Sequence, residues 1–165
     1  MSISLQFKLS DFEDASARID SSIRQTPLLK ADRLFHNPLS TGNLFLKLEN
    51  LQPTGSFKVR GAMNTLSMLS KQEKQKGLIT ASGGNHGLAV AYAAFMAQVP
   101  SLIFLPSTTP TKKTEKLRSW GAAIQVIGDV WDEANEAALE KAEKNKMTYV
   151  HPFADKRVIE GQGTV

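Results

Sequence analysis

The chain has 165 residues, enough for one domain with a proper core and too few for two large ones. Hydrophobic residues make up 41% of it and charged residues 22%, a balance typical of soluble globular proteins and not of disordered chains. The formal net charge is +4, but the basic residues form no single block, so a solvated face is favoured over a nucleic-acid surface.

The chain contains no cysteine, which excludes a disulfide framework, a thiolate nucleophile and a cysteine-based zinc site. The first eight residues lack the basic flank and apolar run of a signal peptide, and no apolar segment approaches the ~20 residues that span a bilayer. We therefore expect a cytoplasmic protein that binds neither membrane nor nucleic acid. The three histidines, His36 and His151 among them, show no metal-ligand spacing, so no metal site is predicted.

The first part of the chain predicts a helix, a strand and a second helix. The first helix is expected from Ser10 to Ile23, where apolar residues recur at helical spacing and Ser10 with Glu13 has the form of a capping box. The strand covers residues 43–48 and is followed by a turn at residues 52–55. The second helix is expected from about Lys58 to Leu69.

From Gly77 onward, strands and helices alternate. Strands are predicted at residues 77–81, 102–105, 123–127 and 148–150, with helices at 86–98, 110–120 and 129–145 between them. Thr109 is expected to cap the second of these helices, ahead of Pro110 at its first position. The alternation indicates parallel βαβ units, in which ligands bind at the carboxyl ends of the strands. Residues 158–165 resemble the opening of a further helix, cut off in its first turn.

Two glycine-bearing loops contain the residues best suited to chemistry. Lys58 lies just past the turn at residues 52–55. Alone, it is more typical of a surface lysine on a helix than of an imine-forming lysine, whose amine must lose its proton easily. The second loop, residues 80–87, follows a strand and opens a helix, so its amides favour an anion such as carboxylate or phosphate. Alone, that loop is more typical of a structural turn, and His86 of a packing or capping residue.

Together the two loops carry a specific pattern. The first reads Pro-Thr-Gly-Ser-Phe-Lys-Val-Arg-Gly-Ala at residues 53–62, and the second reads Ser-Gly-Gly-Asn-His-Gly at residues 82–87. Shorter stretches at residues 26–28, 46–50, 105–106 and 160–164 support it. The combination resembles the threonine/serine dehydratase group of fold type II pyridoxal-phosphate (PLP) enzymes, which are α/β proteins with a tryptophan synthase β-like fold.

This resemblance implies roles for individual residues. Lys58 matches the lysine that bonds covalently to PLP, and Phe57 matches the residue that packs beside the ring. Asn85 matches the asparagine that hydrogen-bonds to the 3′-oxygen of PLP. The loop that takes the substrate carboxylate is matched by Ser82, Gly83, Asn85 and His86.

The implied reaction is β-elimination of the hydroxyl from L-threonine or L-serine, giving a 2-oxo acid and ammonia. Lys58 would be the general base and PLP the electron sink. Related serine racemases carry a serine where this chain has Gly83 and use it for proton transfer, so a dehydratase is favoured over a racemase. The alternatives are a non-catalytic remnant or interaction module, and another fold type II enzyme such as a cysteine synthase or threonine synthase.

The resemblance also implies an incomplete architecture, because family members run to roughly 300 residues. By analogy, residues 1–76 begin the large PLP-binding domain and residues 77–153 form a small domain with a four-stranded parallel sheet. Residues 154–165 would return into the large domain, cut off at Val165. We expect the N-terminal half of an enzyme that is a homo-oligomer at full length. Without the glycine-rich phosphate loop, this half should bind PLP weakly or not at all and be inactive alone.

Overall fold

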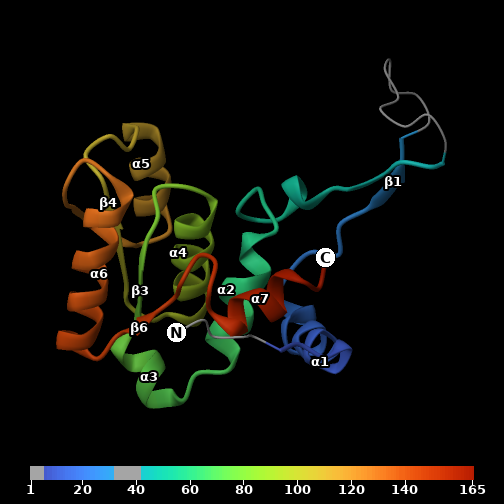
Figure 1. Cartoon of the computed structure of the whole chain (residues 1–165), viewed down its shortest axis with the longest axis horizontal. Coiled ribbons are helices and arrows are strands. Elements are labelled where there is room, and N and C mark those ends of the chain that lie inside the picture. The colour runs from blue at the N-terminus through green and yellow to red at the C-terminus, as the bar shows by residue number, and fades with distance from the viewer. Residues whose placement is uncertain (1–5, 32–41) are drawn as a thin grey trace.

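The molecule contains a four-stranded sheet in which all neighbouring strands are parallel (Figure 1). The computed structural model describes residues 6–31 and 42–165. The strands lie in the order β5-β4-β3-β6, where β3 is Leu78–Ala81, β4 is Ser101–Leu105, β5 is Ala123–Val126 and β6 is Thr148–Tyr149. The predicted α/β class and parallel sheet are confirmed.

Helices cover both faces of the sheet, because alternate strand residues point in opposite directions. On one face, Ile103 and Leu105 join the core cluster formed with α4 (Asn85–Ala97) and α5 (Thr111–Ser119). On the other face, Phe104 packs with α6 (Trp131–Asn145), whose buried side is a row of small residues, Ala134, Ala138 and Ala142. Figure 1 shows α6 on the outer side of the sheet, and α4 between the sheet and α2 (Lys58–Ser67).

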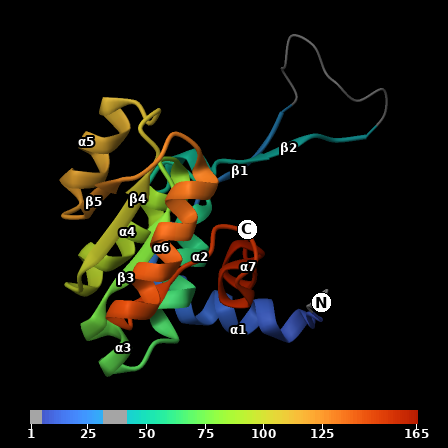
Figure 2. The same cartoon turned by 60° about the vertical axis from the view of Figure 1, so that its left-hand side comes forward.

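A second group of helices lies beyond α4. Helix α2 packs against both α4 and α7 (Lys156–Gln162), and α1 (Leu9–Ile19) packs against α2 and α7 (Figure 2). Val59 and Ala62 of α2 are buried in the same core cluster as α4. The short helix α3 (Lys71–Lys76) leads from this group into β3 and was not predicted.

A two-stranded antiparallel ribbon extends away from the rest of the molecule (Figures 1 and 2). It pairs β1 (Leu28–Lys30) with β2 (Phe45–Lys47), and short 3-10 helices follow α1 at Asp20–Ser22 and β2 at Glu49–Leu51. Strand β1 was not predicted, and β2 is shorter than the predicted strand at residues 43–48. We call this ribbon the β1–β2 arm.

Two predicted helix caps are wrong, although each helix begins within one residue of its predicted start. Helix α1 begins at Leu9, because Asp11 Oδ2 accepts the backbone N–H of Lys8 at 2.9 Å in place of the expected Ser10–Glu13 pair. Helix α5 begins at Thr111, because Pro110 is extended (ψ 139°) and its carbonyl accepts the N–H of Lys113 at 2.9 Å. Thr109 is therefore not the cap.

The other boundaries agree with the predictions to within a few residues. The last predicted helix begins earlier than expected, at Lys156, where Asp155 Oδ1 accepts the N–H of Arg157 at 2.9 Å. Within residues 6–31 and 42–165, no helix combines the length and apolar character needed to cross a membrane. The division at residues 76/77 and 153/154 stays a prediction, and His36 lies outside the described residues.

Candidate functional site

A cleft of about 490 Å³ lies at the carboxyl end of β3, where a parallel sheet is expected to bind its ligands. It is lined by residues from the start of α2, the β3–α4 loop, the start of α6 and the segment after β6: Lys58, Ala81, Ser82, Gly83, Gly84, Asn85, His86, Trp131, Pro152 and Phe153. Five of the six predicted site residues therefore meet in one cleft. The sixth, Phe57, lies beside it.

Lys58 is the first residue of α2 and follows a tight turn. The turn closes where the N–H of Gly55 donates to the carbonyl of Gln52 at 2.8 Å. Gly55 has a φ of +78°, a conformation that glycine adopts without the steric cost of a Cβ. This glycine directs the chain into α2, so that the lysine side chain starts at the edge of the cleft.

The amine of Lys58 is held among carbonyl oxygens and aromatic rings. Its Nζ donates to the carbonyl of Pro152 at 3.2 Å and to Oε1 of Gln162 at 3.3 Å. The ring centroids of Phe57 and Phe153 both lie 5.3 Å from Nζ. Burial lowers the pKa of Lys58 below its usual 10.5, since the neutral amine loses less on leaving water. The amine is thus prepared to lose its proton.

The β3–α4 loop is fixed at both of its ends. The N–H of Ser82 donates to the carbonyl of Phe104 at 3.1 Å, which extends the β3–β4 pairing by one residue, and Ser82 Oγ accepts the N–H of Gly84 at 3.3 Å. A Cβ at Gly87 would lie 2.0 Å from the carbonyl oxygen of Ser82, so the loop can close on α4 only with glycine there. Asn85 begins α4 and is exposed at the cleft, next to the free amides of the first helical turn.

Thr109 occupies the space beside Gly83. A Cβ built on Gly83 would lie 2.8 Å from Cγ2 and 2.9 Å from Oγ1 of Thr109. The residue predicted as a helix cap thus packs its side chain on the β3–α4 loop instead. Any side chain at position 83 would have to displace it.

His86 is buried, with 4% of its surface exposed, and its ring is tied to the end of the sheet. Nε2 donates to the carbonyl of Val150 at 3.0 Å, and the same oxygen accepts Oγ1 of Thr80 at 2.8 Å. Burial lowers the pKa of His86 to about 4, and the hydrogen bond to Val150 offsets only part of that effect. The ring is therefore neutral and acts as a packing residue, as the sequence favoured. Of His86, only the backbone N–H is available to donate a hydrogen bond to an anion in the cleft.

Several cleft residues were not predicted from the sequence. Pro152 and Phe153 follow β6 directly, so the rule that ligands bind at carboxyl ends of parallel strands could have indicated them. Trp131 closes one side, where its Nε1 donates to the carbonyl of Ala81 at 2.8 Å. Gln162 stood only within the supporting stretch at residues 160–164, and nothing local to it indicated contact with Lys58.

Comparison with known families and curated proteins gives one consistent result. The family model described as "Pyridoxal-phosphate dependent enzyme" matches residues 19–165. The catabolic L-threonine dehydratase TdcB of Staphylococcus aureus (strain USA300) is 43% identical over 157 residues, which are 95% of this chain and 45% of that protein. The chain thus spans less than half the length of the curated relatives it matches.

Solved structures agree with this fold. A serine racemase from Dictyostelium discoideum superposes with a TM-score of 0.86 at 35% identity, covering 95% of this chain and 50% of the racemase. The processed form of threonine deaminase isoform 2 from Solanum lycopersicum superposes with a TM-score of 0.81 at 37% identity, covering 96% and 44%. Both a racemase and a deaminase therefore share this architecture.

Proposed function

Because the chain belongs to the pyridoxal-phosphate dependent enzyme family, we propose that its cleft is a PLP site and that the whole protein is a threonine/serine dehydratase. The reaction would convert L-threonine or L-serine into a 2-oxo acid and ammonia. One observation supports the proposal: the amine of Lys58 and the amino end of α4 face the same cleft. The threonine dehydratase at 43% identity supports this choice of substrate class.

The residues of the cleft fit PLP. Lys58 offers a half-buried amine with a lowered pKa, as a group that bonds covalently to a carbonyl needs. Phe57 lies 5.3 Å from that amine and would pack beside the ring, while Asn85 would bond to the ring oxygen. When bound, PLP would supply an electron sink for charge developing on the α-carbon of the substrate.

The chain's own residues would hold the substrate and move its proton. Lys58 Nζ would take the α-proton as general base, kept at the cleft by its contact with the Pro152 carbonyl at 3.2 Å. The substrate carboxylate would lie against Ser82, Gly83 and the backbone amides of Asn85 and His86. Since α4 is a 13-residue helix whose first amides have no partner within the helix, its amino end favours that anion.

A dehydratase fits this cleft better than a racemase. Inverting the α-carbon needs a second proton-carrying group on the face opposite Lys58. Gly83 has no side chain to supply it, and Thr109 fills the adjacent space, 2.8 Å from where a Cβ would start. The second candidate is a binding module that holds PLP without turnover, since Lys58 and the start of α4 could hold the group without completing the reaction.

Covalent trapping tests the PLP site. We expect incubation with PLP followed by borohydride to attach a phosphopyridoxyl group to Lys58, located by mass spectrometry of the digested chain. Lys58→Ala should abolish this label, whereas Lys71→Ala, which removes an exposed lysine on α3, should leave it intact. Labelling spread over surface lysines, with no preference for Lys58, would contradict the proposal.

Turnover separates the two candidate functions. Ammonia release from L-threonine by the PLP-treated chain would support the dehydratase, whereas Lys58 labelling without ammonia would support a binding module. A protein of the relatives' full length should release ammonia from L-threonine if residues outside this sequence contribute to the site. An extended protein that binds PLP on Lys58 but racemises serine without releasing ammonia would contradict the dehydratase assignment.

A further inference from the structure

Gln162, the last residue of α7, contacts the amine of Lys58. Its Oε1 accepts a hydrogen bond from Lys58 Nζ at 3.3 Å, across 104 residues of sequence. Its Nε2 is buried and has no hydrogen-bond partner among the residues that the structure describes. A buried amide donor without a partner costs free energy, so a structural role alone does not account for this side chain.

Two glycines bring Gln162 to this place. A Cβ on Gly161 would lie 2.6 Å from the carbonyl oxygen of Arg60 and 2.8 Å from the Cα of Gly61. A Cβ on Gly61 would lie 2.7 Å from the carbonyl oxygen of Val158. The backbones of α2 and α7 therefore touch directly, which sets the last residue of α7 beside the first residue of α2.

An amide suits a lysine that must change its protonation state. The charged amine has only hydrogens to donate, and Oε1 can accept one of them. The neutral amine has a lone pair, and Nε2 at the other end of the same amide can donate to it. A carboxylate at this position could serve only the charged form and would stabilise it.

We propose that Gln162 is a positioning residue for Lys58, which holds the amine in both its charged and its neutral form through the two ends of one amide. The inference rests on the proposed function in one respect, that Lys58 is the reacting amine. It goes beyond that function by assigning to α7 the control of how readily Lys58 loses its proton.

The electrostatic surroundings allow this effect to be measured. Among the described residues, no carboxylate forms an ion pair with Lys58. The titratable groups around Lys58 are His86 of α4, His151 after β6 and Asp155 before α7. Lys58, His151 and Asp155 each act on the pKa of His86. His86 is neutral above pH 6, since burial holds its pKa at about 4. A new carboxylate at position 162 would therefore be the nearest opposite charge.

The test measures the pKa of Lys58 in the chain without PLP. Competitive acetylation of lysines at a series of pH values, read by mass spectrometry of the Lys58 peptide, gives this value without any turnover. We expect Gln162→Glu to raise the pKa of Lys58 by about one pH unit or more, and Gln162→Met to lower it by a smaller amount. Gln125→Glu, which adds the same charge on the exposed edge strand β5, should leave it unchanged.

A second measurement leaves Gln162 in place, so it tests the inference even if the Gln162 variants do not fold. The side-chain amide NMR signal of Gln162 should follow the titration of Lys58 and should lose this dependence in Lys58→Met. Either response supports the inference. A Lys58 pKa that is the same in folded Gln162 variants, or a Gln162 signal indifferent to Lys58, would overturn it. PLP takes no part in either measurement. Failure of PLP labelling would therefore contradict the proposed function without contradicting this inference.

Discussion

His86 has to be neutral for the chain to fold around it. Its pKa is about 4 in the folded protein and 6.5 in the ordinary case. Below pH 6.5 the unfolded chain therefore takes up a proton that the folded chain refuses, and stability falls until pH 4, where both forms are protonated. We expect this residue to cost about 3 kcal/mol of unfolding free energy over that range, about 2 kcal/mol of it by pH 5.

Urea unfolding followed by circular dichroism at pH 7 and pH 5 measures this effect. The His86→Gln variant lacks the histidine at position 86 that would take up this proton, so its unfolding free energy should differ less between pH 7 and pH 5. Glu49 does not interfere, because its pKa of about 2 confines its contribution to lower pH. Equal pH dependence in the variant and the unaltered chain would contradict the prediction.

The distance along the chain decides which site residues could be predicted. Lys58, Ser82, Gly83 and Asn85 lie in short local patterns that carry their own geometry, and the structure brings them into one cleft. The hydrogen bond from His86 to Val150 spans 64 residues, and the one from Lys58 to Gln162 spans 104. Such contacts depend on how α7 and β6 pack, which no local pattern encodes.

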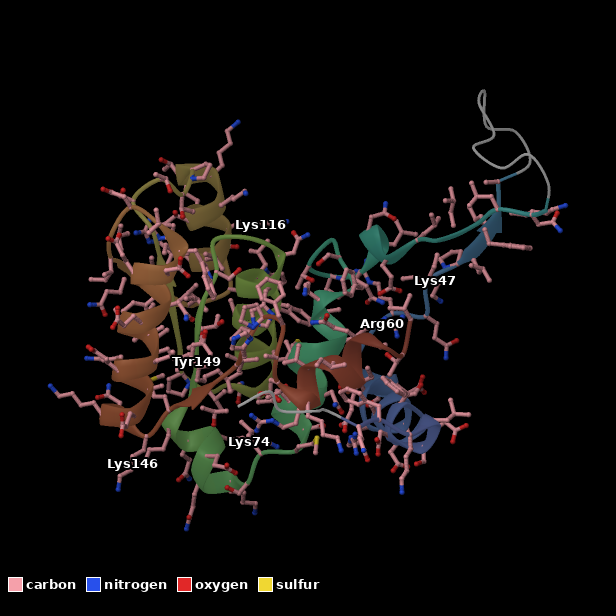
Figure 3. The ribbon with its side chains drawn as sticks, viewed as in Figure 1. Lys47, Arg60, Lys74, Lys116, Lys146 and Tyr149 are labelled. Carbon is pink, nitrogen blue, oxygen red and sulfur yellow. The ribbon has the colours of Figure 1, made fainter. Side chains whose placement is uncertain are left out.

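At the scale of elements, a buried ion pair joins segments from both ends of the chain. Arg60 of α2, labelled in Figure 3, donates from Nε to Glu49 Oε2 at 2.7 Å and from Nη2 to Oε1 at 2.8 Å. Thr26 Oγ1 also donates to Glu49 at 2.6 Å, and Arg60 Nη1 reaches the carbonyl of Thr164 at 3.2 Å. Burial alone would raise the pKa of Glu49, but Arg60 and Thr26 together lower it to about 2.

The Arg60–Glu49 pair joins separate stretches of the sequence that resemble the family. Residues 26, 49, 60 and 164 each lie in one of these stretches; Thr26 bonds to Glu49, and Thr164 bonds to Arg60. We expect Arg60→Leu to destabilise the fold by about 3–5 kcal/mol, because it leaves a buried carboxylate unpaired. Thermal unfolding should show the double variant Arg60→Leu with Glu49→Leu to be more stable than Arg60→Leu alone. A double variant that is the less stable of the two would contradict this account.

The contact between α2 and α7 gives a prediction for Gly161. Alanine there would favour the helix by about 1 kcal/mol in isolation, but its Cβ would lie 2.6 Å from the Arg60 carbonyl. Backbone cannot move aside as a side chain can, so we expect Gly161→Ala to lower the unfolding free energy by about 1–3 kcal/mol. Gly84→Ala is the control, because its Cβ would meet only Ser82 Oγ at 3.9 Å. Equal stability of the two variants in urea would refute the close-contact explanation.

The elements themselves were largely predictable, and the errors have local causes. Alternating apolar strands and helices after Gly77 predicted the parallel sheet, because the central strands β3 and β4 are buried on both faces and read as apolar runs. Strand β1 was missed because it has three residues, all exposed, and no alternation to detect. The cap of α5 was predicted wrongly because Pro110 adopts an extended conformation, which the residue type alone permits but does not require.

At the scale of the whole molecule, the β1–β2 arm exposes a group of apolar side chains. Its residues Leu28, Leu29, Phe45 and Leu46 are 61%, 51%, 51% and 41% exposed. A two-stranded ribbon that exposes apolar side chains is a ready template for another strand. We therefore expect a second copy of this chain to pair with the arm, and the chain to associate as its concentration rises.

Sedimentation velocity over a range of concentrations measures this association. Leu29 and Leu46 are direct partners across the arm, so changing both to lysine puts two like charges side by side and should shift the population toward monomer. Met68→Lys is the matched control, because Met68 is 46% exposed but lies at the end of α2, outside the arm. It should leave association unchanged. A chain that sediments as a monomer at every concentration, or an arm variant that associates as strongly as the unaltered chain, would show that the arm does not mediate contact between copies.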